Sequence, residues 1–260
     1  MIDRVTSFIF PALTLLGLVA LWHFSIDLFA IPDYLLPRPS SVISHLKTGY
    51  IDGSFWPHFA FTLQSTATGY LLGCVSAILV GAALAESRTF EKCFYPFIVA
   101  LQSMPKVALA PLIIVWFGYG AASKVMMVAL MCFFPLFVNT VVGIRQTDRQ
   151  LVSMMRSFSA PASLVFFRVK LYAAAGHIFA GLQISIVLAL IGAVVAEFVA
   201  SSKGIGWLIQ SALANFNTAQ MFAALLSLVA IGLVGTQVIQ FLHRRVVFWE
   251  QAAPMTALPE

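Results

Sequence analysis

Residues 59–85 read FAFTLQSTATGYLLGCVSAILVGAALA and contain no charged side chain. A helix needs roughly 20 predominantly apolar residues to cross the hydrocarbon core of a bilayer. Inside that core the backbone N–H and C=O groups must pair within the protein, and a helix achieves this most simply. This stretch therefore predicts a transmembrane helix, and it indicates the fold class of the whole chain.

Five further predominantly apolar runs of similar length occur, at residues 8–28, 94–117, 125–144, 174–197 and 221–242. Hydrophobic residues make up 60% of the 260-residue chain and charged residues 10%, whereas an ordinary soluble domain carries roughly 25% charge. The first run follows a weakly charged start without a clear cleavage site, so we expect a retained helix and not a signal peptide. We therefore expect an all-α polytopic membrane protein, a single domain over residues 1–260 with about six transmembrane helices.

The distribution of Lys and Arg predicts the orientation, because cytoplasmic loops are enriched in these residues. With the N-terminus inside, the predicted outer side holds Arg38, Lys47, Lys124 and Lys203. The predicted inner side holds ten cations, which are Arg4, Arg88, Lys92, Arg145, Arg149, Arg156, Arg168, Lys170, Arg244 and Arg245. We therefore expect both termini in the cytoplasm. The net charge of +5 then reflects topology and gives no support to a nucleic-acid partner.

Two segments on the predicted outer side have the pattern of ordered helices. Ser40 is placed to cap a short helix up to Tyr50, and Gly204 and Gly206 allow a bend before a second segment that ends at Ala214. We expect both segments to cover the outer mouth of a pathway.

The predicted cytoplasmic segment 145–172 has the pattern of a helix and not of a flexible loop. Leu151, Met154, Met155 and Phe158 recur at helical spacing and share one face. Ser159-Ala160-Pro161 should end this helix, and a second short helix should run from Pro161 toward Lys170. An apolar ridge flanked by arginines suits docking into another protein's groove, and it equally suits lying on anionic lipid headgroups.

Several motifs occur in order between Leu36 and Trp249. They are Leu36-Pro37-Arg38-Pro39, Met104-Pro105-Lys106-Val107-Ala108-Leu109-Ala110-Pro111-Leu112, Trp116-Phe117-Gly118-Tyr119-Gly120, Phe133-Phe134-Pro135, Ala196-Glu197 and Gly204-Ile205-Gly206. Together they resemble the inner-membrane permease subunits of ATP-binding-cassette importers, in the branch for nitrate, taurine, aliphatic sulfonates and related small solutes. The resemblance implies the permease fold of a type I importer, with a cytoplasmic coupling helix between membrane helices four and five.

In that family the segment before helix five carries a signature that begins Glu-Ala-Ala, has a glycine a few residues later and ends near Leu-Pro and a further proline. This chain departs from it, with Ser153-Met154-Met155, Ser159, Leu171-Tyr172 and Gly176 at those positions. The resemblance implies that the segment couples to the ATPase through Leu151, Met154, Met155, Arg156, Phe158, Ser159 and Ala160. We hypothesise that Met154, Met155 and Phe158 make an apolar contact with the ATPase in place of the polar contact that is usual in the family.

Lys106 is the one charged residue that the sequence places near the middle of a predicted span. An ionised side chain there costs roughly 3 kcal/mol, so it usually faces protein or water. Pro105 and Pro111 should kink the helix and open carbonyl groups toward a cavity. Gln102, Pro105 and Lys106 are therefore candidates to line a translocation pathway for an anionic solute. The favoured interpretation of Lys106 itself is that it pairs with a carbonyl group, snorkels or only shapes the subunit interface.

Glu197 ends the fifth predicted span and is a second pathway candidate, either as a gate or as a group that positions substrate. Solvation at the headgroups is the favoured interpretation, because a carboxylate at the end of a span costs little free energy. Asp27 and Glu86 are interpreted in the same way. In the second span Gly69, Gly73, Ala77 and Gly81 recur every four residues, a spacing that predicts close helix packing.

No motif of an enzyme, a metal site or a cofactor site occurs. The sequence has no GxxxxGK[ST] loop, no HExxH and no GxSxG. Its three cysteines and five histidines show no metal-ligand spacing. We therefore expect no cofactor and no ATPase activity of the chain's own.

The resemblance implies a permease subunit in the bacterial cytoplasmic membrane that forms half of a pathway. Its implied partners are a cytoplasmic ATPase dimer, a periplasmic or extracellular substrate-binding protein and a second permease copy, with a homodimer expected and a heterodimer possible. The expected solute is a nitrate, sulfonate or taurine type anion, and a pyrimidine vitamin precursor or an aromatic acid is the alternative. An ion-coupled secondary transporter is less well supported, because such proteins usually place carboxylates or histidines at mid-membrane.

Overall fold

The computed structural model describes residues 2–249; the side chains of residues 2–9, 11, 12 and 88 lie outside the described set, and with them the predicted inner cations Arg4 and Arg88. Every regular element in this part of the chain is helical. The elements are α1 (Ile2–Leu28), α2 (Pro39–Ile51), α3 (Trp56–Glu86), α4 (Arg88–Ser103), η1 (Lys106–Leu109), α5 (Ala110–Phe117), α6 (Ala121–Arg145), α7 (Arg149–Ser157), α8 (Ala162–Val165), η2 (Phe166–Lys170), α9 (Leu171–Ala200), α10 (Ile205–Ala214) and α11 (Thr218–Val246).

The chain forms two compact units, and each is assembled from two separate segments. Unit 1 contains Met1–Thr62 and Ser202–Val229, and unit 2 contains Leu63–Ser201 and Ala230–Glu260. Helices α3 and α11 therefore contribute to both units. The expectation of one domain over the whole chain stays a prediction.

Within residues 2–249, four helical segments are long and apolar enough to cross a membrane. They are α3, α6, α11 and the continuous stretch Ala162–Ala200, and they confirm the predicted spans at 59–85, 125–144, 174–197 and 221–242. The predicted span at 8–28 lies within α1, whose part Leu13–Leu28 is a shorter apolar helix.

The predicted span at 94–117 is broken and does not form one straight helix. Thr89–Ser103 and Lys106–Phe117 meet at an angle of 92°, and they make a fifth candidate span only if both parts are taken together. Met104 has extended backbone angles, with φ −74° and ψ 141°, because the ring of the following proline disfavours a helical conformation at this position. The sequence predicted a kink at Pro105 but not a bend of this size.

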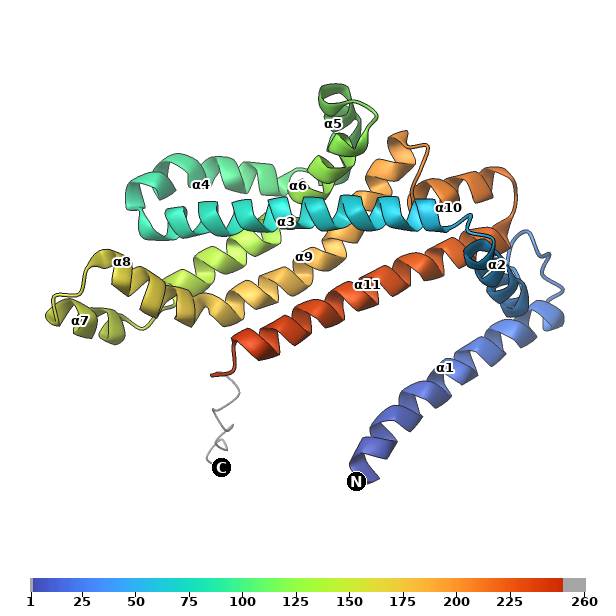
Figure 1. Ribbon diagram of the computed structural model, residues 1–260, viewed down its shortest axis with the longest axis horizontal. Coiled ribbons are helices and arrows are strands. Elements are labelled where there is room, and N and C mark those ends of the chain that lie inside the picture. Colours follow the sequence, from blue (N-terminus) through green and yellow to red (C-terminus); the bar gives the residue numbers. More distant parts are fainter. Residues whose placement is uncertain (1, 250–260) are drawn as a thin grey trace. The chain divides into compact units, whose positions relative to one another are not determined.

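Unit 2 is built around α6 and α9, which lie side by side, with α3 packed against them (Figure 1). Its buried cluster includes Tyr70 and Ala77 of α3, Phe137 of α6 and Ala189 of α9. The predicted small-residue stripe of α3 makes this packing possible. A Cβ atom added at Gly73 would lie 2.6 Å from the carbonyl oxygen of Ala129 on α6, so only glycine fits at this contact.

The two short helices predicted around Ser40 and after Gly204 are present in unit 1 as α2 and α10. Ser40 does not cap α2, because the helix already begins at Pro39, with Arg38 as the N-cap residue and without a side-chain cap. The buried cluster of unit 1 consists of Val42, Phe55, Ile205, Leu208, Ile209, Ala223 and Ala224. Two side chains of α3 complete the N-terminus of α10. His58 Nδ1 accepts a hydrogen bond from the Gly204 N–H at 3.1 Å, and Thr62 Oγ1 accepts one from the Ile205 N–H at 2.8 Å. These bonds satisfy N–H groups that a helix start leaves without a partner.

Candidate functional site

Helix α7 forms the first half of the predicted coupling segment, and local sequence signals define both of its ends. Asp148 caps the N-terminus, where its carboxylate accepts a hydrogen bond from the Gln150 N–H at 2.7 Å. At the C-terminus the Ala160 N–H donates to the Met155 carbonyl and the Ser159 N–H donates to the Arg156 carbonyl. This is the hydrogen-bond pattern of a Schellman motif.

Ser159 occupies the left-handed position that this motif requires, with φ at 55°. A residue with a Cβ atom is disfavoured there by about 1 kcal/mol or more relative to glycine. By sequence resemblance, this is the position at which the family signature has glycine. The geometry therefore supplies a physical reason for that glycine, and it shows that this chain keeps the same turn with a serine.

The apolar face predicted for α7 is largely open to solvent. Leu151 and Met154 are about half exposed, and Phe158 is 78% exposed. Met155 is only partly exposed, so the exposed ridge consists of Leu151, Met154 and Phe158, at spacings of three and four residues. Large apolar side chains grouped in this way mark a surface for another protein or for lipid.

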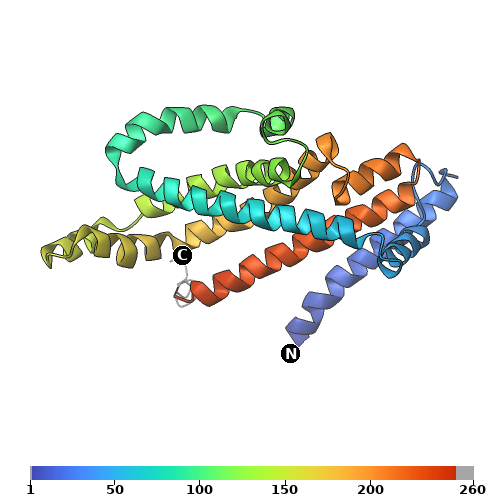
Figure 2. The ribbon, with the colours of Figure 1, turned by 45° about the horizontal axis from the view of Figure 1, so that its top comes forward.

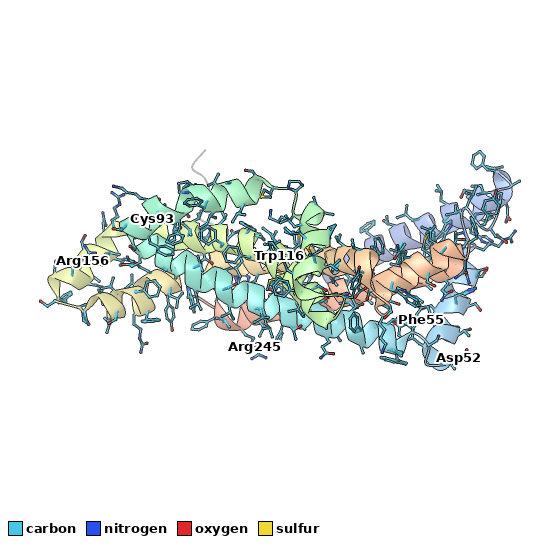
Figure 3. All side chains as sticks on the ribbon, turned by 90° about the horizontal axis from the view of Figure 1, so that it is seen from above. Asp52, Phe55, Cys93, Trp116, Arg156 and Arg245 are labelled. Carbon is cyan, nitrogen blue, oxygen red and sulfur yellow. The ribbon has the colours of Figure 1, made fainter. Side chains whose placement is uncertain are left out.

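Two ion pairs tie the helices together at the α7 end of unit 2. Lys170 Nζ lies 2.6 Å from Glu86 Oε2, and an Arg145 guanidinium nitrogen lies 2.7 Å from Glu91 Oε2. Arg156 and Lys170 line a small pocket with a volume of about 110 Å³, together with Glu86. Figure 3 shows Arg156 at this end of the unit, with Cys93 of α4 nearer to it than Trp116 of α5 is. Glu86 thus binds a specific partner and is not merely a solvated end residue.

The second half of the coupling segment is continuous with a membrane helix. The helix predicted from Pro161 toward Lys170 is present as α8 followed by η2, and it runs without interruption into α9. The coupling segment was predicted to end near residue 172, but the helix is not interrupted there. No proline or glycine occurs between 162 and 175, so nothing in this stretch stops the helix. Figure 2 shows α7 and α8 projecting from this end of unit 2.

Three of the predicted pathway residues lie at the bend of the broken helix. Gln102 is near the C-terminus of α4, Pro105 lies in the bend and Lys106 begins η1. Lys106 Nζ donates to the Gln102 carbonyl oxygen at 3.3 Å and lies 4.7 Å from the centroid of the Phe134 ring. Gln102 and Pro105 are exposed and Lys106 is half-buried. The bend thus presents polar groups on an otherwise apolar segment.

The fourth predicted pathway residue, Glu197, lies in the last turn of α9 and is fully buried. This differs from the favoured expectation of a headgroup-solvated side chain. Lys124, predicted in an outer loop, is also fully buried, and the charge of Glu197 acts on its ammonium group. One feature of the sequence pointed to this pair. Lys124 and Glu197 have opposite charges, and the predicted topology places both at span ends on the same side of the membrane.

Unit 1 contains a cavity with a volume of about 520 Å³. Asp33 and His45 of the first chain segment of unit 1 line it, together with Asn215, Phe216 and Thr218 of the second segment. The Thr218 hydroxyl donates to the Asp33 carbonyl oxygen at 2.7 Å and joins the two segments. Sequence analysis assigned no residue to this cavity.

An apolar helical bundle, a proline-broken helix and a short exposed helix at one end together define a polytopic helical membrane protein. Residues 69–248 match the family described as "binding-protein-dependent transport system inner membrane component". The chain belongs to this family, whose members are permease components of bacterial transport systems.

Relatives match nearly the whole chain. The riboflavin transport system permease protein of Chloroflexus aurantiacus is 37% identical over 96% of this chain and 94% of its own length. The formylaminopyrimidine transport permease protein of Halalkalibacterium halodurans is 31% identical, over 93% of this chain and 96% of its own length. An aliphatic sulfonates transport permease protein of Bacillus subtilis is 29% identical, over 90% and 85%. The resemblance to importer permeases is thereby confirmed.

Proposed function

We propose that this chain is the permease subunit of an ATP-driven importer and that α7 couples it to a cytoplasmic ATPase dimer. The exposed ridge of Leu151, Met154 and Phe158 carries the proposal, since it stands at the end of an apolar bundle and is flanked by Arg149 and Arg156. Apolar side chains at helical spacing are what a groove on a partner protein binds. Ser159 and Ala160 complete the turn that orients the ridge.

In this proposal the pathway forms between two permease copies, with the bend at Gln102, Pro105 and Lys106 lining it. Exposed polar groups on a membrane helix are unfavourable against lipid, which favours contact with a second subunit or with water. A homodimer is the simplest arrangement. Both termini lie in the cytoplasm, as the distribution of Lys and Arg favours.

The solute class that we propose is a small heterocyclic nutrient. The riboflavin and formylaminopyrimidine relatives support this class. Lys106 is already bound by the Gln102 carbonyl and lies over the Phe134 ring, which weakens the argument that it awaits an anion. A sulfonate, taurine or nitrate type anion is the second candidate, and the aliphatic-sulfonate relative supports it.

A substrate-binding protein would deliver this solute at unit 1. The 520 Å³ cavity supports docking there, because it is open and is lined by one acidic side chain, Asp33, beside amide groups and the Phe216 ring. A basic side chain on the binding protein would complement Asp33. The family description, which names binding-protein dependence, supports such a partner.

Reconstitution with the ATPase and binding protein of the same transport system tests the proposal. Uptake into proteoliposomes should require ATP, and Leu151→Asp with Phe158→Asp should abolish both ATPase co-purification and uptake. Ser153→Asp with Ser157→Asp adds the same two negative charges at exposed positions of α7 outside the ridge and should retain both. Uptake driven by a proton or sodium gradient without ATP would instead support a secondary transporter.

Mass spectrometry of the ligand bound to the purified binding protein decides between the solute classes. A heterocycle supports the first class, and a sulfonate, taurine or nitrate supports the second.

A further inference from the structure

Lys124 lies in the first turn of α6 and is the largest fully buried side chain in the described part of the protein. Its Nζ donates to the carbonyl oxygen of Tyr119 at 2.7 Å and to the carbonyl oxygen of Ala200. Glu197, one turn before Ala200, balances its charge. An ammonium group buried without such partners would be strongly destabilising, so these contacts explain how a lysine is accommodated at this position.

The two carbonyl groups belong to different parts of unit 2. Tyr119 lies in the turn Gly118–Gly120, which links the broken helix to α6, and Ala200 is the last residue of α9. Carbonyl groups at a helix C-terminus carry partial negative charge and bind cations favourably. The single ammonium group of Lys124 therefore joins the end of α5, the start of α6 and the end of α9.

Apolar packing next to this contact joins the same three helices. Ala110 and Ile113 of α5 pack with Met127 and Met131 of α6 and with Ala196 of α9. Glu197 follows Ala196 directly in the sequence. The polar contact thus lies at the edge of an apolar cluster that holds the second half of the broken helix.

The opposite end of α9 is continuous with η2 and α8, which follow the α7 turn. The stretch Ala162–Ala200 therefore links the turn after α7 to the C-terminal turn of α9 as one continuous helix. There it meets the contact that holds α5, and α5 follows the bend that carries Lys106.

We propose that Lys124 and Glu197 are positioning residues for transport, which fix α5 to α6 and α9 so that the bend moves with α9. This inference deepens the proposed function and rests on it. Neither residue needs to touch the solute. Loss of either one should leave ATP hydrolysis intact and uncouple it from movement of the broken helix.

A distance measurement within unit 2 tests the mechanical part of the inference. Spin labels at Val115→Cys on α5 and Val199→Cys on α9 use exposed positions, with the exposed Cys93 replaced by serine. The assembled complex should give one narrow distance distribution. Lys124→Met and Glu197→Gln should each broaden it, whereas Lys92→Met, which removes an exposed cation from α4, should not.

The ratio of solute transported to ATP hydrolysed tests the functional part. Lys124→Met and Glu197→Gln should lower this ratio at least tenfold in complexes that retain ATPase activity, and Lys124→Arg should restore part of it. A merely structural role would lower the yield of complex but not the ratio. If the methionine variant does not assemble, Glu197→Gln decides by the same two measurements.

The inference is overturned if these variants keep a narrow distance distribution and an unchanged ratio of solute transported to ATP hydrolysed. Failure of the proposed function has a different signature, because uptake would then be independent of ATP in the unaltered complex while the distances still responded to both substitutions.

Discussion

Gly73 faces the backbone of α6 so closely that a methyl group at this position should separate the two helices. An alanine Cβ would lie 2.6 Å from the Ala129 carbonyl oxygen and 2.9 Å from its Cα atom. Atoms in contact normally lie at about 3.5–4.0 Å, so α3 and α6 would have to move apart by about 1 Å. Both obstructing atoms belong to the backbone of a buried helix, and no side-chain rotation relieves the contact.

The expected magnitude follows from two opposing effects. Overpacking a well-packed interior costs about 1–3 kcal/mol, and replacing glycine by alanine within a helix gains about 0.5–1 kcal/mol. The difference between these ranges is about 0–2.5 kcal/mol, so Gly73→Ala should lower the free energy of unfolding by about 1 kcal/mol. Gly17→Ala in α1 is the matched control, because a Cβ atom there meets nothing within 4 Å. The control should be neutral or slightly stabilising.

Denaturant titration of the purified protein in mixed micelles measures both variants. A larger residue, Gly73→Leu, should reduce the amount of folded protein further. The reasoning would be refuted if Gly73→Ala unfolded with the same free energy as Gly17→Ala, because α3 and α6 would then accommodate a methyl group without moving apart.

Three further predictions follow from contacts described above. Ser159→Gly should stabilise the turn after α7 by about 1 kcal/mol through relief of the left-handed backbone, measured as slower proteolysis of the α7 segment. Glu86→Gln should lower the free energy of unfolding by no more than about 1 kcal/mol, because its pair with Lys170 is partly exposed; a double-mutant cycle with Lys170→Met measures the coupling. Thr62→Val should cost about 1–2 kcal/mol, because it leaves the Ile205 N–H unsatisfied, and hydrogen exchange at the start of α10 should accelerate.

The spans and the ridge of α7 could be predicted because each depends on local sequence. An apolar run long enough for a bilayer has few alternatives to a helix, and the spacing of Leu151, Met154 and Phe158 places them on one face of any helix. The close contact of Gly73 was also indicated, since small residues every four positions form a groove.

The buried pair of Lys124 and Glu197 could not be predicted in this way. A lysine at a span end has the same sequence signature whether it reaches water or turns inward, and the outcome depends on whether a carboxylate and free carbonyl groups lie at the same depth. The carboxylate and one of the two carbonyl groups come from α9, far along the chain. The prediction for Lys106 has the same limit, because the position of a residue within an apolar run does not reveal a bend of the helix.

The discontinuous make-up of unit 1 has a consequence for biosynthesis. His58 and Thr62 enter the membrane early, yet the backbone groups that they bind belong to Gly204 and Ile205, which are made 146 and 143 residues later. Unit 1 therefore cannot close while the ribosome is still adding α6 or α9. Its first helices must wait in the bilayer until α10 has been made, and we expect this interval to be the stage at which a membrane chaperone or quality-control protease competes for the nascent permease.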